Sequence, residues 1–259
     1  MFHFNGNDNK GGNGCKTGLS RKQQAISDRE VELIQLAKSI IQEQGVTNLT
    51  MDKVTAASQY SKGTIYNHFC SKEDLVVALC QHTMKYEIAL FSRVKSFKGS
   101  TREKVLALHV CYQIYIRMEP VASMLIMISK SPWITEKASE ERVKERGKLE
   151  KKLFEIAYEI IDAAVKKGDL QYSSGMGADA VLFANWSLLF GANALAQTAR
   201  SECIDQMESR YSALFNANVL LDGLRWQPLS TEWDYHKSWR RIEKELFSEE
   251  LAYLKTVGC

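Results

Sequence analysis

Helical periodicity runs along almost the whole chain, and few residues interrupt it. The 259 residues include only three prolines, Pro120, Pro132 and Pro228. Proline breaks a helix because it lacks a backbone donor and clashes with the preceding turn. No segment alternates apolar and polar residues between turn signals as a strand would, and no internal repeat is present. The sequence therefore predicts an all-α fold.

Capping residues mark several ends of the predicted helices. Ser71 precedes acidic residues at the start of one helix, and Ser100 with Glu103 forms a capping box at the start of another. Gly168 follows two lysines at the end of a long helix. The predicted helices lie before Gly45 and over about residues 51–58, 62–68, 72–95, 101–118, 121–129, 133–167, 178–199, 204–226 and 231–256.

Composition is that of an ordinary soluble globular protein, with 45% hydrophobic and 25% charged residues. Six cysteines without a CxxC pair argue against a zinc ribbon or a disulfide framework and favour a reducing compartment. The N-terminus lacks the apolar stretch of a signal peptide, and no run of about 18 apolar residues predicts a membrane span. We therefore expect a cytoplasmic protein without a membrane partner.

The first 20 residues are rich in glycine and asparagine and cannot bury a core, so residues 1–20 are expected to form a disordered tail. Their segment GGNGCKT is no phosphate-binding loop, because Cys15 separates Gly14 from Lys16.

Chemistry-bearing motifs are otherwise scarce. The chain has no nucleophile elbow, zinc-binding HExxH, paired catalytic carboxylates or nucleotide fingerprint, which argues against the alternative of a helical enzyme. A helical lipid-binding protein is a further alternative. Cys70, Cys80 and His82 lie near each other, but scattered cysteines are usually small hydrophobic residues rather than a metal or redox switch. We expect no metal and no cofactor.

Residues 50–69, TMDKVTAASQYSKGTIYNHF, contain two helices too short to be stable alone, joined by a brief turn. This is the pattern of a helix-turn-helix, whose second helix enters the major groove of DNA. Ile65 and Phe69, four residues apart, would form its buried stripe, and Gly63 lets the backbone approach another molecule. The remaining side chains can hydrogen-bond and would face outward.

Residues 34–78 resemble the DNA-binding domain of TetR-family regulators. The resemblance rests on Gln44-Gly45, on Thr50-Met51, and above all on SKGTIYNHFCSKEDL over residues 61–75, close to the family form SxGTxYxHFxSKExL. It implies a three-helix helix-turn-helix DNA-binding domain over residues 21–82 and a larger helical ligand-binding and dimerisation domain over residues 83–228. Residues 229–259 are expected to form a C-terminal helical extension beyond the family's usual end.

The resemblance also implies roles for individual residues. The expected DNA contacts are Thr50, Ser61, Lys62, Gly63, Thr64, Tyr66, Asn67, His68 and Lys72. Those that look like phosphate contacts are Thr50, Tyr66, His68 and Lys72, and Asn67 would reach a base edge or a phosphate. Geometry favours base contacts for Lys62, Thr64 and Asn67. Taken alone, Tyr66 and His68 are equally compatible with packing. Arg21 and Lys22, expected before the first helix, are a basic arm or a solvated pair.

The turn between the two short helices departs from the family. It reads Ser58-Gln59-Tyr60 where Ala-Gly-Val is common, and Thr55 replaces a usual alanine. If Gln59 took the left-handed conformation of that glycine, the cost would be about 1 kcal/mol or more. We therefore expect a reshaped turn, and loss of DNA binding through it is an alternative.

The C-terminal part is rich in methionine and aromatic residues at helical spacing. Such residues usually form a core, but they also line adaptable apolar pockets. The pocket residues expected for a small apolar or amphipathic ligand are Tyr115, Met118, Met124, Met127, Trp133, Phe154, Tyr158, Phe183 and Trp186.

Residues 178–199 are apolar on nearly every face and must be covered on most of them. The resemblance places them, with residues 204–226, in a four-helix homodimer interface, which implies a near-palindromic double-stranded DNA operator. The last helix, expected to begin at Ser230 or Thr231, would pack across that dimer or on its own ligand-binding domain.

The predicted function is a ligand-responsive transcriptional regulator, acting as a repressor. The alternatives are an activator and a ligand-independent DNA-binding regulator.

Overall fold

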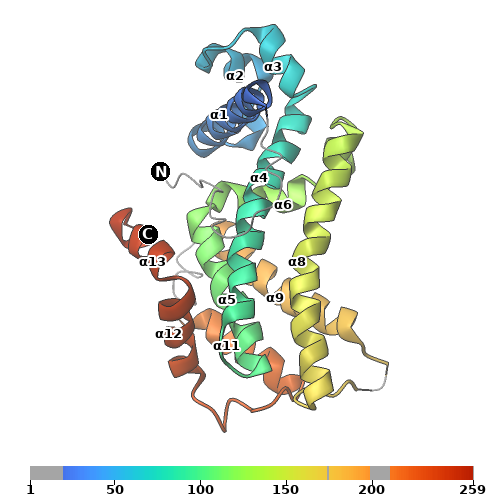
Figure 1. Ribbon diagram of the computed structural model, residues 1–259, viewed down its shortest axis with the longest axis vertical. Helices are drawn as coiled ribbons and strands as arrows, with labels where there is room; N and C mark the ends of the chain where they lie inside the picture. Colours follow the sequence, from blue (N-terminus) through green and yellow to red (C-terminus); the bar gives the residue numbers. More distant parts are fainter. Residues whose placement is uncertain (1–19, 174, 199–210, 259) are drawn as a thin grey trace.

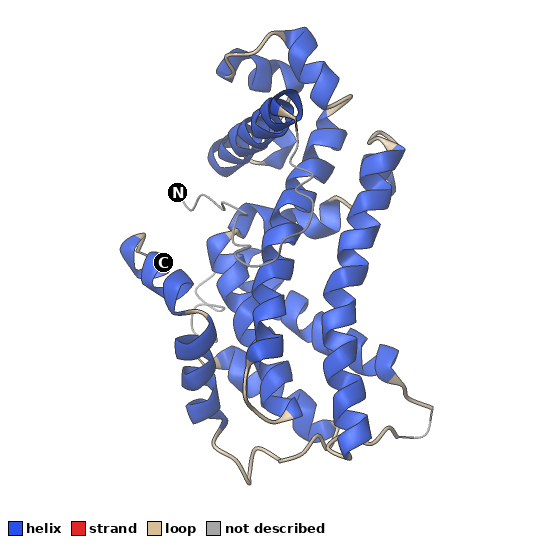
Figure 2. Cartoon of the chain, in the orientation of Figure 1, coloured by secondary structure: helices blue, strands red, loops and turns tan. Residues whose placement is uncertain are grey.

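The computed structural model describes residues 20–173, 175–198 and 211–258. Within these ranges every regular element is a helix, and no strand occurs (Figure 2). The predicted all-α fold is confirmed. No helix in the described part is long and apolar enough to cross a membrane.

The α-helices are α1 (Arg21–Gln44), α2 (Met51–Ala57), α3 (Lys62–His68), α4 (Lys72–Arg93), α5 (Thr101–Met118), α6 (Pro120–Ile128), α7 (Pro132–Thr135), α8 (Glu140–Lys167), α9 (Ala178–Thr198), α11 (Ser212–Gly223), α12 (Tyr235–Leu246) and α13 (Ser248–Thr256). Short 3₁₀ turns, η1 (Val46–Asn48) and η2 (Val94–Ser96), follow α1 and α4.

Local capping determines many of these ends as predicted. The Ser71 hydroxyl accepts a hydrogen bond from the backbone of Asp74, and Ser100 and Glu103 form the reciprocal capping box. Gly168 ends α8 with φ of 80°, a left-handed conformation that favours glycine. Pro120 occupies the first position of α6, where its missing donor costs nothing.

The start of α1 corrects one expectation. Arg21 and Lys22 form its first turn rather than an arm that precedes the helix. Ser20 caps this turn, and its capping box with Gln23 explains why the helix begins so early. Residues 1–19 of the expected tail lie outside the described residues.

Two predicted helices are each divided in the structure. The helix expected over 133–167 is interrupted before α8, because Ser139 turns to donate its backbone and hydroxyl hydrogens to Asp74, at 2.8 and 2.7 Å. The helix expected over 231–256 begins at Tyr235 under an Asp234 cap and divides at Phe247, whose side chain is fully buried. Of the helix expected over 204–226, residues 204–210 lie outside the described residues.

The buried hydrophobic residues form two clusters. The first lies among α1 to α4 and also takes in Val121, Leu125 and Ile134 from α6 and α7. The second fills the space between α5, α8, α9, α11 and the C-terminal helices. Figure 1 shows α4 passing from one end of the molecule to the other beside α8. Its residues Leu79 and Leu90 belong to the first and second clusters, respectively.

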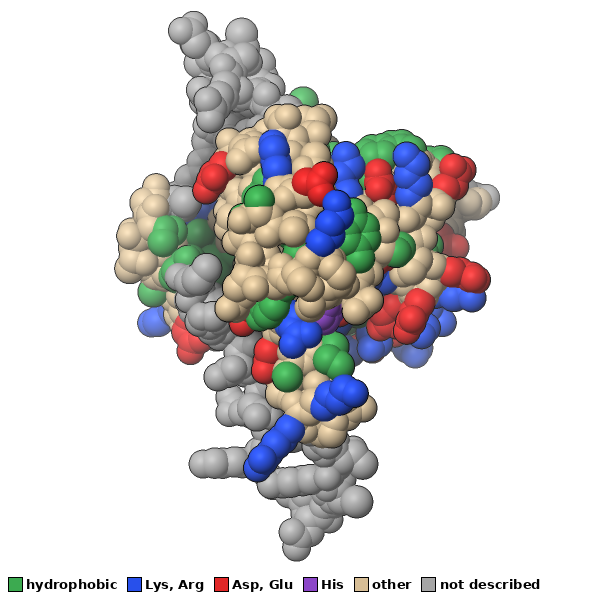
Figure 3. All heavy atoms as spheres, turned by 90° about the horizontal axis from the view of Figure 1, so that it is seen from above, with side chains coloured by type: hydrophobic (Ala, Val, Ile, Leu, Met, Phe, Trp, Pro, Cys, Tyr) green, Lys and Arg blue, Asp and Glu red, His purple; other side chains and the backbone are tan. Residues whose placement is uncertain are grey.

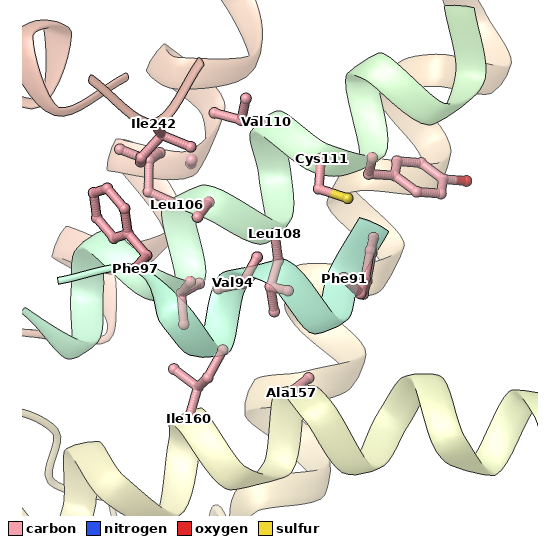
Figure 4. Packing of buried hydrophobic residues seen from close by; sticks show 14 of the residues in the cluster. Phe91, Val94, Phe97, Leu106, Leu108, Val110, Cys111, Ala157, Ile160 and Ile242 are labelled. Carbon is pink, nitrogen blue, oxygen red and sulfur yellow. The ribbon is translucent and has the colours of Figure 1, made fainter. Parts of the chain in front are cut away.

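The second cluster joins segments distant in sequence. Phe91 and Val94 from the end of α4 and η2 pack near Leu108 of α5 and Ala157 of α8 (Figure 4). On the other side of α5, Ile242 of α12 is fully buried. The C-terminal half of the long α8 thereby contributes one apolar face to this core.

The C-terminal extension packs on α5 of its own chain, one of the two arrangements expected. Trp239, Ile242 and Leu254 are buried, and Leu246 is half-buried. Beneath it, the fully buried guanidinium group of Arg102 pairs with Asp222 at 2.7 Å, donates to the carbonyl of Trp226, and lies 4.6 Å from the ring centroid of Tyr235. The extension is therefore part of the core.

Replacing Trp239 should reveal this dependence. Trp239→Ala removes a buried ring and should lower the free energy of unfolding by about 3–5 kcal/mol. Trp233→Ala, at a ring that is 48% exposed, is the matched control and should cost about 1 kcal/mol or less. Urea unfolding followed by circular dichroism measures both, and equal losses would contradict the assignment.

Candidate functional site

The two short helices α2 and α3 are held by caps and by a narrow buried stripe. Thr50 accepts a hydrogen bond from the backbone of Lys53, and Ser61 accepts one from the backbone of Thr64, both at 3.2 Å. Ile65 and Phe69 are fully buried. This stripe anchors α3 on one face and leaves the other face of the helix at the surface.

The exposed face of α3 carries most of the residues expected to contact DNA. Ser61, Lys62, Gly63, Tyr66 and Asn67 are exposed, and Thr64 and Lys72 are half-buried, as is the end of the helix at His68. Thr50 is also exposed, at the start of α2. Figure 3, which looks onto this end of the molecule, shows basic side chains interspersed with acidic ones among uncharged groups.

Lys62 already has an acidic neighbour. Its ammonium group lies 2.9 Å from Asp52 of α2 and 5.8 Å from the ring centroid of Tyr66. The hydrogen bond that Lys62 donates to Asp52 raises the pKa of Lys62 above its usual value. Both charged side chains are exposed, so the pair is weak and a phosphate can displace the carboxylate.

His68 corrects the expectation of an outward phosphate contact. Its side chain is only 7% exposed, and Nδ1 lies 3.8 Å from Glu30 of α1. Burial lowers its pKa, in opposition to Glu30, so the ring is mainly neutral at pH 7. This arrangement supports the alternative role for His68, in which its side chain packs against α1.

The turn between α2 and α3 is reshaped without a left-handed residue. Among the described non-glycine residues only Arg225 has a positive φ, so Gln59 bears no such strain. Instead, the Ser58 hydroxyl accepts a hydrogen bond from the backbone of Tyr60 at 2.9 Å. The Tyr60 hydroxyl donates to Glu32 of α1 at 2.5 Å. The side chain that replaces the usual valine therefore binds the turn to α1.

Arg142 of α8 connects this DNA-facing unit to the rest of the molecule. Its guanidinium group donates to Asp74 of α4 at 3.2 Å, to Glu30 of α1 at 3.2 Å and to the carbonyl of His68 at 3.1 Å. It also lies 5.0 Å from the ring centroid of Phe69. One side chain of α8 thus contacts α1, α4 and the end of α3.

Sequence reasoning missed this junction. Arg142 stands in a run of charged residues that looks solvated, and its partners are distant in the sequence. Asp74 offers no local signal, since it follows Lys72 and Glu73 in a polar first turn of α4, yet its side chain is only 3% exposed. Buried carboxylates are usually paired, which would have suggested a partner without identifying it.

A cavity lies among α4, α5, α8 and α9, with about 650 Å³ of space not filled by protein atoms, part of it open to solvent. Its lining residues are Glu87, Phe91, Val105, Leu108, His109, Tyr112, Leu153, Phe154, Ala157, Ile161, Leu182, Asn185, Trp186 and Leu189. A smaller cavity of about 460 Å³ adjoins it and shares Glu87, Tyr112, Leu153, Phe154 and Trp186.

Only Phe154 and Trp186 of the expected pocket residues line these cavities. Tyr115 is in the core and Met118 packs against it. The half-buried Tyr158 donates to Asp179 at 2.5 Å. The remaining expected residues are 44% exposed or more, and they are Met124, Met127, Trp133 and Phe183. Helical spacing identified apolar faces, but it did not say which face of α6 or α9 turns inward.

The cavity wall also contains polar residues that the sequence did not reveal. His109 is 1% exposed, and its Nε2 lies 3.1 Å from Oδ1 of Asn185. Burial lowers the pKa of His109 to about 4, so its ring is neutral at pH 7. Glu87 is 5% exposed, and burial raises its pKa to about 8. A mainly apolar wall with a few polar groups is typical of a specific ligand site.

Cys70, just before α4, and Cys80 and His82 within it form no comparable site. Cys70 is exposed, whereas Cys80 is buried and burial raises its pKa to about 11. His82 contacts Gln35 at 3.5 Å. Within the described residues, no three His, Cys, Asp or Glu side chains gather as metal ligands would.

The fold and the exposed face of α3 define a helical DNA-binding protein with an internal cavity. Residues 33–79 match the family described as "Bacterial regulatory proteins, tetR family". An HTH-type transcriptional regulator of Mycobacterium tuberculosis H37Rv, itself called uncharacterized, is 29% identical over 167 residues, which are 64% of this chain and 74% of that protein. These matches support a TetR-type DNA-binding domain in a transcriptional regulator.

Solved structures agree on the fold. A TetR/AcrR-family regulator from Thermobifida fusca is 22% identical, with a TM-score of 0.52 over 78% of this chain and 98% of that one. FadR from Bacillus subtilis, in complex with stearoyl-CoA, is 17% identical, with a TM-score of 0.55 over 77% of this chain and 98% of its own. These similarities confirm a helical fold of the TetR type.

Removing the Arg142 guanidinium group should destabilise the protein. Arg142→Met leaves the buried Asp74 carboxylate without its cation and should lower the free energy of unfolding by about 3 kcal/mol. Lys144→Met, two residues away at a mainly exposed side chain, should change it by about 0.5 kcal/mol or less. Urea titration of both variants checks this, and equal stabilities would refute the role of the junction.

Proposed function

We propose that the chain is a ligand-responsive repressor that binds a near-palindromic operator as a homodimer. The main support for the proposal is that α4 and α8 contact both the cavity and the helix-turn-helix. Both helices line the internal cavity, and Asp74 and Arg142 at their other ends hold the helix-turn-helix. A ligand that moves these helices relative to each other would therefore move α3.

The proposed DNA contacts follow from exposure. Lys62, Tyr66 and Asn67 offer exposed polar groups on the outer face of α3, with Thr64 beside them. We assign Lys62, Thr64 and Asn67 to base edges, and Thr50, Tyr66 and Lys72 to phosphates. Ser61 and Gly63 bring the backbone close to DNA. His68 supports α3 from behind.

The proposed dimer interface consists of exposed apolar side chains on α9 and α11. Phe183, Leu195, Phe215 and Val219 are each at least 58% exposed, and the two helices pack against each other. Large exposed apolar side chains on neighbouring helices support a protein contact. A twofold dimer would present two α3 helices to successive major grooves, which is why a near-palindromic operator is expected.

A ligand for the cavity is supported by its mainly apolar wall with a few polar groups. The FadR structure of the same fold is a complex with stearoyl-CoA, which supports ligand binding by this architecture without identifying the ligand of this chain. Binding can release DNA only if the ligand prefers the conformation in which the two α3 helices no longer match the operator.

DNA binding is tested with duplexes from the region upstream of the protein's own gene. Fluorescence anisotropy across a salt series should show affinity falling steeply with salt. Lys72→Ala should weaken binding to all duplexes and reduce the salt slope by about 1. Asn67→Ala should cost about 1–3 kcal/mol on the preferred duplex and relax its sequence preference.

The surface variant Lys151→Ala, on α8, serves as the control because its side chain is 79% exposed and distant from α3 in the sequence. It should bind as the unmodified protein does. DNA affinity that does not depend on salt, or that is unchanged in both Lys72→Ala and Asn67→Ala, would contradict the proposed interface.

The dimer is tested by introducing a charge into the exposed apolar face. Phe215→Glu should convert the dimer to a monomer in analytical ultracentrifugation, because two carboxylates would be desolvated across the twofold axis. Val257→Glu, at an exposed apolar residue after α13, should leave the dimer intact. A Phe215→Glu protein that remains dimeric would exclude this face as the interface.

A further inference from the structure

Glu87 is a cavity residue whose carboxyl group makes no hydrogen bond to another described residue. Its side chain is 5% exposed and borders both cavities. Burial and the charge of Lys130 are the two influences on the pKa of Glu87, and no described residue donates a hydrogen bond to its carboxyl group. An unpaired buried polar group costs free energy, so buried carboxyl groups normally have partners. The missing partner of Glu87 is therefore to be sought in a ligand.

The apolar part of the wall offers ring faces next to this carboxyl group. Phe91, Tyr112, Phe154 and Trp186 all line the larger cavity. The ammonium group of Lys130 already lies 5.0 Å from the Trp186 ring centroid. Aromatic faces attract cations through their quadrupole, and the attraction grows where water is excluded.

The charges around Glu87 favour a positively charged ligand over a negatively charged one. No lysine or arginine occurs among the described residues that line the larger cavity. Lys130, beyond the end of α6, pairs with Glu150 of α8, and Arg146 of α8 donates to the carbonyl of Ser129. An anion in the larger cavity would thus lack a free cation there.

The remaining titratable groups near Glu87 are neutral at pH 7. Burial raises the pKa values of Cys111, Tyr112 and Tyr115 on α5, and it lowers that of His109 to about 4. His109 is already paired with Asn185, the polar residue that α9 contributes to the wall. Glu87 is therefore the group on which a ligand charge would act.

We propose that the larger cavity binds a lipophilic organic ammonium ion, with its nitrogen against Glu87 and its apolar part on the aromatic wall. This assignment specifies the chemical class of the ligand. It rests on the proposed function only for the ligand's regulatory role. Because burial raises the pKa of Glu87 to about 8, the carboxyl group is mainly protonated at pH 7. Binding of the cation would release this proton to solvent and leave a carboxylate–ammonium pair.

Isothermal titration calorimetry with three matched probes tests the assignment. They are phenylbutyl-trimethylammonium, whose charge does not titrate, the alcohol phenylbutanol and the anion phenylpentanoate. The cation should bind at least about tenfold more tightly than the other two. Its affinity should rise about tenfold from pH 7 to pH 9, as Glu87 ionises, and level off above that.

Glu87→Gln keeps the shape of the side chain but cannot ionise. It should lose at least about tenfold in affinity for the cation and lose the pH dependence, while phenylbutanol binds as before. Glu155→Gln, at an exposed carboxylate of α8, should behave as the unmodified protein does. Thermal unfolding of each variant confirms that it is folded.

Equal or tighter binding of the anion, an unchanged cation affinity in Glu87→Gln, or no binding of any probe would overturn the assignment. DNA anisotropy with the same probes separates it from the proposed function. If the cation binds through Glu87 and DNA stays bound, the proposed cation site is supported and the proposed ligand response is contradicted. If the alcohol or the anion releases DNA and the cation does not bind, the proposed ligand response is supported and the cation site is contradicted.

Discussion

The contact between Arg142 and Asp74 is the interaction on which the arrangement of the two ends of the molecule depends. Asp74 is buried in the first turns of α4 and accepts hydrogen bonds from Ser139 as well as from Arg142. A buried carboxylate requires such partners, because its desolvation is costly without them. Since Ser139 immediately precedes α8 and Arg142 lies in its first turn, satisfying one charge also places the start of a 28-residue helix.

That placement has a mechanical consequence for the helix-turn-helix. The same guanidinium group reaches the end of α3 through the carbonyl of His68, and Tyr60 ties the preceding turn to α1 through Glu32. The recognition helix is therefore held from both ends by polar contacts to other helices, whereas its own stripe of Ile65 and Phe69 is small. Small displacements of α8 would reach α3 without passing through a loop.

The sequence predicted those features whose determining residues lie close together in the chain, and missed those that depend on distant partners. The bounds of α2 and α3 could be predicted because Thr50 and Ser61 cap helices a few residues away. The break before α8 could not, because it depends on Asp74, 65 residues from Ser139. His68 shows the same limit, since its side chain is turned inward by Glu30 of a different helix.

The cavity was the least predictable part. Apolar spacing marked Phe154 and Trp186 correctly, but it could not show that Met127 and Phe183 lie on outer faces of their helices. The polar residues of the wall gave no periodic signal at all. A lone Glu87 on a long helix resembles a solvated residue until the packing of four helices encloses it.

The first hydrophobic cluster shows how closely the DNA-facing end is interlocked with the remainder. It is completed by Val121 and Leu125 of α6 and Ile134 of α7, and α4 passes from it directly into the second cluster. Neither the DNA-facing end nor the remainder of the chain forms its hydrophobic cluster from its own helices alone. Unfolding of one should therefore expose apolar surface of the other. Recombination between relatives would accordingly be tolerated least at a cut through α4.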